Sequence, residues 1–136
     1  MSVLVDTSVW SLALRRRSPS PNAAVVEELI GLVRDGRARI IGPIRQELLT
    51  GIKVETHFEQ VREHLDAFPD LPLVSADYVN AARLSNRCRA NGIQGTEVDL
   101  LICAVAVARR LPIFTTDGDF AHYRKVIDLE LHAPAS

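Results

Sequence analysis

The chain has 136 residues, of which 47% are hydrophobic and 24% charged, and its formal net charge is −1 at pH 7. This composition excludes a disordered chain, and the near-neutral charge argues against a strongly basic protein that coats nucleic acid. The chain has no apolar run of the roughly 18 residues that a membrane span needs, no basic N-terminal signal region and only two cysteines, so we expect one cytoplasmic domain over residues 1–136 without a membrane partner.

In the first half of the chain, short apolar runs alternate with segments of helical periodicity. Val3 to Val5 is a β-branched run that predicts a buried strand, and Thr7 and Ser8 are suited to cap a helix that reaches Leu14. The further predicted elements are a helix from Asn22 to Asp35, a strand at Ile40–Ile41, a helix from Pro43 to Gly51 and a helix from Glu55 to Phe68.

The second half continues the alternation of strands and helices. Its predicted elements are a brief extended piece at Leu73–Val74, a helix from Ser75 toward Cys88, an apolar helix from Thr96 to Arg110, a strand at Ile113–Thr115, a turn at Asp117–Asp119 and an edge strand at Leu129–Leu131. Because short apolar strands alternate with helices, we expect a three-layer α/β/α domain with a mainly parallel central sheet.

Four acids stand at the edges of these apolar segments. Asp6 directly follows the first strand, and Asp117 follows the strand at Ile113–Thr115, with Asp119 two residues later. Glu47 shares a helical stripe with apolar residues that we expect to be buried, and Asp99 precedes a long apolar run. Because ligands collect at the carboxyl ends of parallel strands, we expect these acids to meet at that edge of the sheet.

Bringing several carboxylates together requires a counter-charge. Two unit charges about 4 Å apart repel by roughly 4 kcal/mol at an effective dielectric of 20. A cluster must therefore take up protons or hold a cation. Because ligand sets made only of oxygen favour hard cations, the acids predict Mg²⁺, with Mn²⁺ as the alternative.

Each acid also has a purely structural explanation. Asp6 would then belong to an ordinary strand-to-helix turn, and Asp99 to a capping box that begins at Thr96. Glu47 would form a buried salt bridge with Arg45 or another arginine, and Asp117 would sit in a plain turn. These explanations are independent of one another, whereas one shared site explains all four positions at once.

Four segments follow one another in a specific order: Val5–Trp10 (VDTSVW), Pro43–Leu48 (PIRQEL), Thr96–Ala104 (TEVDLLICA) and Thr115–Phe120 (TTDGDF). As an ordered set they resemble PIN-domain ribonucleases of the VapC toxin type, and a threonine before a D-x-D-F turn is especially typical. The set spans nearly the whole chain and matches at every acidic position. The segment from about residue 55 to residue 73 carries no motif.

The resemblance implies that Asp6, Glu47, Asp99 and Asp117 are the catalytic residues and the magnesium site. Asp6 and Asp99 would touch the metal most directly, and Glu47 would hold a bound water or a second ion. Asp117 would complete the site with help from Asp119. The supporting groups, which would hydrogen-bond a metal-bound water or a phosphate oxygen, are Ser8, Thr115 and Thr116.

The activity that the resemblance implies is that of a magnesium-dependent endoribonuclease, the toxic component of a type II toxin–antitoxin module of the VapBC kind. Magnesium would lower the pKa of a bound water and offset the charge of the transition state. No ribose 2′-hydroxyl nucleophile is needed, so the products would carry 5′-phosphate and 3′-hydroxyl ends. The alternative is a noncatalytic RNA-binding or scaffold protein on the same fold.

Arginines supply most of the positive charge and are the candidates for RNA contacts. Arg15, Arg16 and Arg17 follow the first predicted helix, where they would bind the RNA backbone or, alternatively, satisfy the helix dipole in solvent. A second group, for which a solvated face is the simpler explanation, consists of Arg83, Arg87 and Arg89. Trp10 is suited to stack on a base, but half-buried packing is the simpler expectation.

The resemblance also implies two protein partners, a second copy in a homodimer and a cognate antitoxin in a hetero-oligomer. The apolar residues that would line the antitoxin groove, or else belong to the core, are Leu12, Leu14, Val26 and Ile30. A signalling receiver domain is a poorer match, because it needs a lysine near the last strand. The only lysines here are Lys53 and Lys125.

Overall fold

A computed structural model describes residues 1–15 and 22–134 of the chain. In chain order the elements are β1 (Val3–Val5), α1 (Thr7–Leu14), α2 (Ala23–Arg34), β2 (Ala38–Arg39), α3 (Gly42–Leu49), α4 (Glu55–Leu65), α5 (Ser75–Ala90), α6 (Glu97–Arg109), β3 (Ile113–Phe114) and α7 (Asp119–Tyr123). None of the described helices is long and apolar enough to cross a bilayer.

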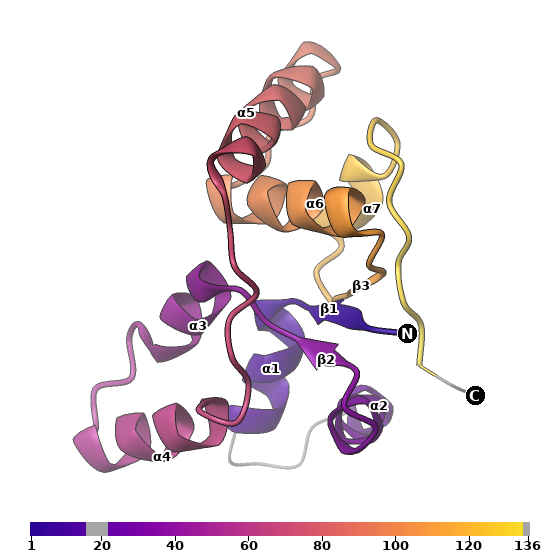
Figure 1. The fold of residues 1–136 in the computed structure, drawn as a ribbon. Coiled ribbons are helices and arrows are strands. Elements are labelled where there is room, and N and C mark those ends of the chain that lie inside the picture. Colours follow the sequence, from indigo (N-terminus) through magenta and orange to yellow (C-terminus); the bar gives the residue numbers. More distant parts are fainter. Residues whose placement is uncertain (16–21, 135–136) are drawn as a thin grey trace.

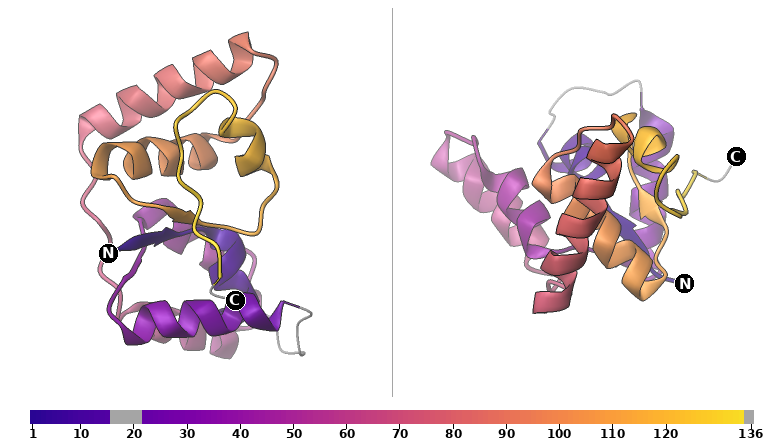
Figure 2. Two further views of the ribbon diagram at one scale, coloured as in Figure 1. Left: turned by 90° about the vertical axis from the view of Figure 1, so that its right-hand side faces the viewer. Right: turned by 90° about the horizontal axis from the view of Figure 1, so that it is seen from above.

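The helices cover both faces of a small sheet. Helices α5, α6 and α7 lie on one side, whereas α1, α2 and α4 lie on the other, as Figure 1 and the turned views of Figure 2 show. The strands follow the order β2-β1-β3, and both pairings are parallel. The predicted three-layer α/β/α architecture with a mainly parallel sheet is confirmed.

The central strand positions the candidate site. All three residues of β1 are fully buried, and Leu4 pairs with Arg39 of β2 on one side and with Ile113 of β3 on the other. Because β1 and β3 are parallel neighbours, their carboxyl ends reach the same edge of the sheet. The residues that follow them, Asp6 and Thr115, therefore come into contact there.

The strand predictions at three places need correction. Strand β2 ends at Arg39, before the predicted Ile40–Ile41, and Ile40 forms only a single bridge with Asp70. No strand forms at Leu73–Val74, and the predicted edge strand is reduced to one bridge between Leu131 and Ile113. Ile40 and Ile41 are fully buried. Their β-branched side chains therefore signalled burial in the core rather than pairing in the sheet.

Two helix predictions also differ from the structure. Helix α1 is capped by Asp6, whose carboxylate accepts the Ser8 N–H at 3.4 Å, rather than by Thr7 or Ser8. The turn at Asp117–Asp119 leads directly into α7, a five-residue helix that the sequence did not predict. Asp and Gly residues favour turns and helix starts alike, so local sequence does not separate the two outcomes.

A buried ion pair joins α5 to α6. Asp77 is only 4% exposed, and its carboxylate accepts two hydrogen bonds from Arg109, at 2.9 and 3.0 Å. It also accepts the Val74 N–H at 2.8 Å, while Arg109 donates to the Pro72 carbonyl at 2.7 Å. These hydrogen bonds, chiefly those from Arg109, hold the pKa of Asp77 below its usual range.

Candidate functional site

A cavity of about 550 Å³ opens at the carboxyl edge of the sheet. Its lining combines the end of β1, the face of α3 and the start of α6, and it includes all four predicted acids: Asp6, Glu47, Asp99 and Asp117. We call it the acid cavity. No lysine or arginine of the described chain lines it, so the carboxylates meet without a protein cation among them.

Asp6 is the most buried of these acids. The residue is 4% exposed, and its Oδ2 accepts hydrogen bonds from the hydroxyls of Ser8 and Thr115, each at 2.8 Å. Within the described residues, no donor of the protein reaches its other oxygen, Oδ1. The hydroxyls therefore fix the orientation of the carboxylate and leave one oxygen to face the acid cavity.

The predicted supporting hydroxyls tie the ends of β1 and β3 together. Besides contacting Asp6, the Ser8 and Thr115 oxygens lie 3.2 Å apart and accept the backbone N–H groups of Thr116 and Asp117, each at 3.0 Å. Thr116 thus contributes a backbone donor, whereas its side chain is exposed. A contact from any of these hydroxyls to a metal-bound water or a phosphate stays a prediction.

Glu47 does not occupy a buried stripe, contrary to the sequence expectation. Ile44 and Leu48 are fully buried on the core side of α3, but Glu47 is exposed at the cavity wall and accepts the Thr7 hydroxyl at 2.7 Å. A helical step of three residues rotates a side chain about 60° away from strict alignment. That rotation turns Glu47 out of the core and into the acid cavity.

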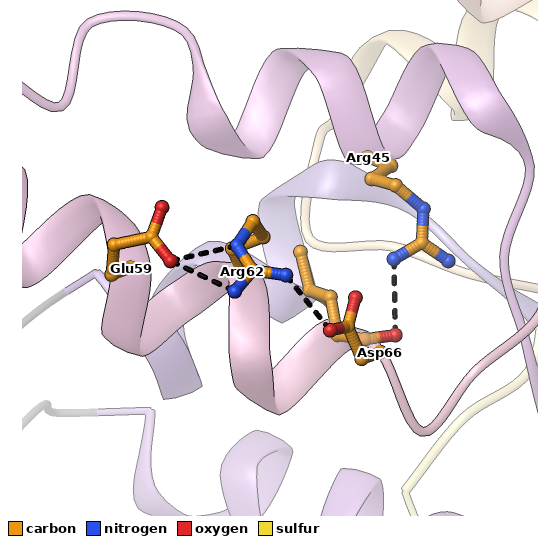
Figure 3. Close-up of polar contacts among 5 residues, drawn as sticks. Arg45, Glu59, Arg62 and Asp66 are labelled. Atoms are coloured by element: carbon orange, nitrogen blue, oxygen red, sulfur yellow. Dashed lines mark hydrogen bonds and ion pairs between the residues drawn. The ribbon is translucent and has the colours of Figure 1, made fainter.

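The proposed salt bridge between Glu47 and Arg45 is not formed either. Arg45 instead pairs with Asp70 at 3.0 Å and donates to the carbonyls of Leu65 and Phe68, which holds the end of α4 against α3. Figure 3 shows this arginine beside an exposed pairing on α4, in which Arg62 bridges Glu59 and Asp66. The Glu47 carboxylate is thus left without this counter-charge.

Asp99 lies in the first turn of α6, and it lines the acid cavity. Thr96 caps the helix by accepting the Asp99 N–H at 3.0 Å, while the Asp99 carboxylate accepts the Tyr123 hydroxyl at 2.7 Å. The predicted capping box is therefore only half formed, because the Asp99 carboxylate accepts the Tyr123 hydroxyl rather than the backbone N–H of Thr96. Burial, together with the charges of Asp6 and Asp117, raises the pKa of Asp99 to about 6.

Tyr123 is a site residue that the sequence reasoning missed. It is 1% exposed, and burial, with its hydrogen bond to Asp99, raises the pKa of its hydroxyl, so it remains a donor. Gly95 makes room for it, because a Cβ there would lie 2.2 Å from Leu100 Cδ2 and 2.8 Å from Tyr123 Cε1. The available signal was the spacing of Phe120 and Tyr123, both buried on one face of α7.

The tightest acidic group consists of Asp99, Asp117 and Asp119. One carboxylate oxygen from each lies within 4.8 Å of the others, and the Asp119 N–H donates to Asp117 Oδ1 at 2.9 Å. Asp119, expected only to assist, therefore lies in one group with Asp99 and Asp117, whereas Asp6 and Glu47 do not belong to this group. This all-carboxylate set, in which burial and then the charges of Asp6 and Asp117 raise the pKa of Asp99, fits a hard divalent cation.

The remaining sequence candidates fall outside the acid cavity. Arg15 ends α1 and does not line it, while Arg16 and Arg17 lie outside the described residues. Trp10 is 2% exposed and donates its indole N–H to the Val5 carbonyl at 3.1 Å, so it packs more fully than expected and is closed to a base. Of the proposed groove residues, Leu12 is buried in the core, whereas Ile30 is 50% exposed.

One testable consequence concerns stability without metal. The pKa of Asp99 is about 6 in the fold against an ordinary 3.8, so stability falls as pH rises from about 4 to 6 and stays lower above that. Asp99→Asn removes this cost. Since the Asp99 carboxylate is partly solvated, we expect the free energy of unfolding of Asp99→Asn to exceed that of the parent by about 1 kcal/mol at pH 7.5 in EDTA. Thermal melts at pH 7.5 and at pH 4 measure it, because the gain should vanish at pH 4.

The control for this measurement is Asp128→Asn, an equal change of charge at an exposed acid by the opposite end of α6. It should leave the melting temperature nearly unchanged at both pH values. A stabilisation of Asp99→Asn that persists at pH 4 would contradict the electrostatic origin.

Comparisons with known proteins agree with the fold described above. The family model of the PIN domain matches residues 3–126. In the crystal structure of FitAcB from Neisseria gonorrhoeae, a chain 22% identical superposes with a TM-score of 0.75 over 97% of both chains. A chain in the crystal structure of VapBC2 from Rickettsia felis, bound to a DNA fragment from its promoter, superposes with a TM-score of 0.75. It is 17% identical, and the superposition covers 97% of this chain and 98% of that one.

A third solved structure is VapBC-5 from Mycobacterium tuberculosis, a member of the VapBC family of toxin–antitoxin systems. It gives a TM-score of 0.69 at 22% identity, with 96% of each chain covered. No curated protein sequence matches the chain. At these identities the solved structures show that the fold is shared.

Proposed function

Because this chain belongs to the PIN domain family, we propose that it is a metal-dependent endoribonuclease and the toxin of a VapBC-like toxin–antitoxin module. The observation that carries the proposal is the convergence of four carboxylates on one cavity that contains no lysine or arginine among the described residues. Such a set is costly to assemble for structure alone, and it is suited to hold a divalent cation beside a phosphodiester.

Asp99, Asp117 and Asp119 are the residues that would hold Mg²⁺ or Mn²⁺, together with the open oxygen of Asp6. When bound, the ion would lower the pKa of a coordinated water and offset charge on the phosphate. Ser8 and Thr115 keep Asp6 in one orientation, and Tyr123 does the same for Asp99.

Glu47 has a different part in the proposed reaction. It is exposed, comes from α3, lines the acid cavity, and accepts the Thr7 hydroxyl at 2.7 Å. Its carboxylate is therefore suited to accept a hydrogen bond from a water that attacks the phosphate. In this scheme the nucleophile is water rather than the ribose 2′-hydroxyl, and the 3′ oxygen leaves. We therefore expect 5′-phosphate and 3′-hydroxyl ends.

Two protein partners belong to the proposal. Solved structures of the same fold include members of a toxin–antitoxin family, which supports a cognate antitoxin as partner and a homodimer or hetero-oligomer as the assembly. The partly exposed apolar side chains of α2, Ile30 and Val33, are candidates for the antitoxin contact. An RNA target would place the working protein in the cytoplasm.

The test uses the full chain free of antitoxin, incubated with structured RNA and Mg²⁺. We expect cleavage that EDTA abolishes and that Mn²⁺ restores, with products that a 5′-phosphate-dependent exonuclease degrades. The noncatalytic alternative predicts RNA binding with no new ends. If neither Mg²⁺ nor Mn²⁺ supports cleavage of transfer, ribosomal or messenger RNA, the proposed nuclease activity is rejected.

A further inference from the structure

A second hollow, of about 360 Å³, lies beside the acid cavity. It is formed by the last turns of α5, the loop before α6 and the start of α7, and its polar lining residues are Ser85, Arg89, Gln94, Thr96, Asp119 and Tyr123. We call it the Arg89 hollow. Its volume lies within the range of small-molecule sites, roughly 300–1,000 Å³.

The two cavities meet at the acidic group. Asp119 lines the Arg89 hollow, yet its carboxylate lies within 4.8 Å of Asp99 and Asp117, which line the acid cavity. Tyr123 also joins them, since it lines the hollow and donates to Asp99 at 2.7 Å. A phosphate held at the acids would therefore have its neighbouring nucleotide at the mouth of the Arg89 hollow.

Charge separates this hollow from another hollow that borders the acid cavity. That other hollow shares Pro43 and Val98 with the acid cavity, and Glu97 is the only charged residue among the described residues that line it. An RNA strand that approaches four carboxylates needs a cation next to them. Unlike that hollow, the Arg89 hollow at α5 and α7 has an arginine in its lining.

Arg89 is available for this contact. Its side chain is exposed, and it forms no ion pair with any described acid. Its planar guanidinium can bind a phosphate with two donors. The neighbouring arginines are placed differently: Arg83 contacts Asn80 at 3.3 Å, and neither Arg83 nor Arg87 lines the hollow.

We propose that the Arg89 hollow binds the nucleotide adjacent to the scissile phosphate of single-stranded RNA, with Arg89 on the phosphate of that nucleotide. Gln94 and Ser85 supply an amide and a hydroxyl for hydrogen bonds to its base, the kind of contact by which proteins read unpaired RNA. The proposal rests on the proposed ribonuclease function. It adds the route by which the RNA strand leaves the acid cavity, which is through the Arg89 hollow.

The test compares Arg89→Ala with Arg87→Ala, an equal loss of charge two residues away on the same helix. Both changes are made in the Asp6→Asn background with Mg²⁺ present, and binding of a short fluorescent single-stranded RNA is followed by anisotropy over a salt series. Arg89→Ala should weaken binding about tenfold and lower the salt dependence by roughly one phosphate contact. Arg87→Ala should change affinity less than twofold.

A conservative variant guards against a change in folding. Arg89→Lys keeps the charge but loses the two-donor geometry, so we expect an affinity between those of the parent and Arg89→Ala, with an unchanged circular dichroism spectrum. Equal affinities for Arg89→Ala and Arg87→Ala would overturn the proposal.

Binding and cleavage also separate the two proposals. If the parent chain binds RNA through Arg89 but does not cleave it, both the nuclease and the place of this subsite beside a scissile phosphate are overturned, and only an RNA contact at Arg89 remains. A chain that cleaves RNA but binds it equally with and without Arg89 would contradict the subsite alone.

Discussion

Replacing Asp6 with asparagine is expected to lower kcat/KM for RNA cleavage at least about 100-fold while leaving the fold intact. The loss of even an outer-sphere partner of a metal commonly costs 10–100-fold, so the loss of a proposed direct ligand should cost more. The amide oxygen of Asp6→Asn can still accept the Ser8 and Thr115 hydroxyls, which now reach Oδ2 at 2.8 Å. Charge is thus removed and the local geometry is kept.

The measurement uses a fluorogenic RNA at saturating Mg²⁺, with a thermal melt of each protein beside it. Asp128→Asn is the matched control, because it removes the same charge from an exposed acid that lines a separate hollow with Val107 and Arg110. It should keep its activity within twofold. Cleavage by Asp6→Asn at more than a third of the parent rate would show that this carboxylate is not catalytic, or that a contaminating nuclease is present.

The second large effect is on stability, and it comes from Arg109→Met. Breaking a buried ion pair from one side costs about 3–5 kcal/mol, because the remaining charge keeps its desolvation cost. Asp77 is 4% exposed, but the Arg109 side chain is 27% exposed. We therefore expect a loss of about 2–3 kcal/mol at pH 7, or a melting temperature roughly 6–12 °C lower.

The pH dependence identifies the cause of this loss. Arg109 lowers the pKa of Asp77 in the fold, so the stabilisation is present above the unfolded value of about 3.9 and is lost as pH falls through the folded pKa. The gap between the parent and Arg109→Met should thus be full at pH 7 and shrink below pH 4. A gap that stays constant to pH 2.5 would point to lost packing instead.

Arg62→Met is the control for this experiment. Arg62 also contacts two acids, Glu59 and Asp66, at 2.8 and 2.9 Å, but all three side chains are at least 43% exposed (Figure 3). Solvent screens such pairs and side-chain entropy opposes them. The melting temperature should therefore hardly change, although the number of ion pairs removed is larger.

Features that depend on near neighbours could be predicted from the sequence. The strand at Val3–Val5 could be predicted from a short apolar run that begins and ends with β-branched valine. Thr96 could be predicted as the cap of α6 because its hydroxyl can accept a backbone N–H of the first turn. The parallel sheet follows from the alternation of short apolar strands with helices. Because parallel strands end at one edge, Asp6 and Asp117 could also be expected in one place.

The tertiary structure decided which side chains make contact at that place. Asp99 binds the hydroxyl of Tyr123, 24 positions away, and Ser8 lies beside Thr115, 107 positions away. The rotation of α3 turned Glu47 out of the core, and the start of α7 brought Asp119 to the other acids.

The arginines give the plainest case of this division. The sequence offers Arg83, Arg87 and Arg89 on one helix with nothing to rank them, whereas packing of α5 beside the start of α7 places Arg89 alone of the three in the hollow next to the acids. Local backbone preferences and hydrophobic periodicity act within a few residues, so they determine the elements. A site made of long side chains from several elements depends on the angles at which those elements pack, and packing is a property of the whole core.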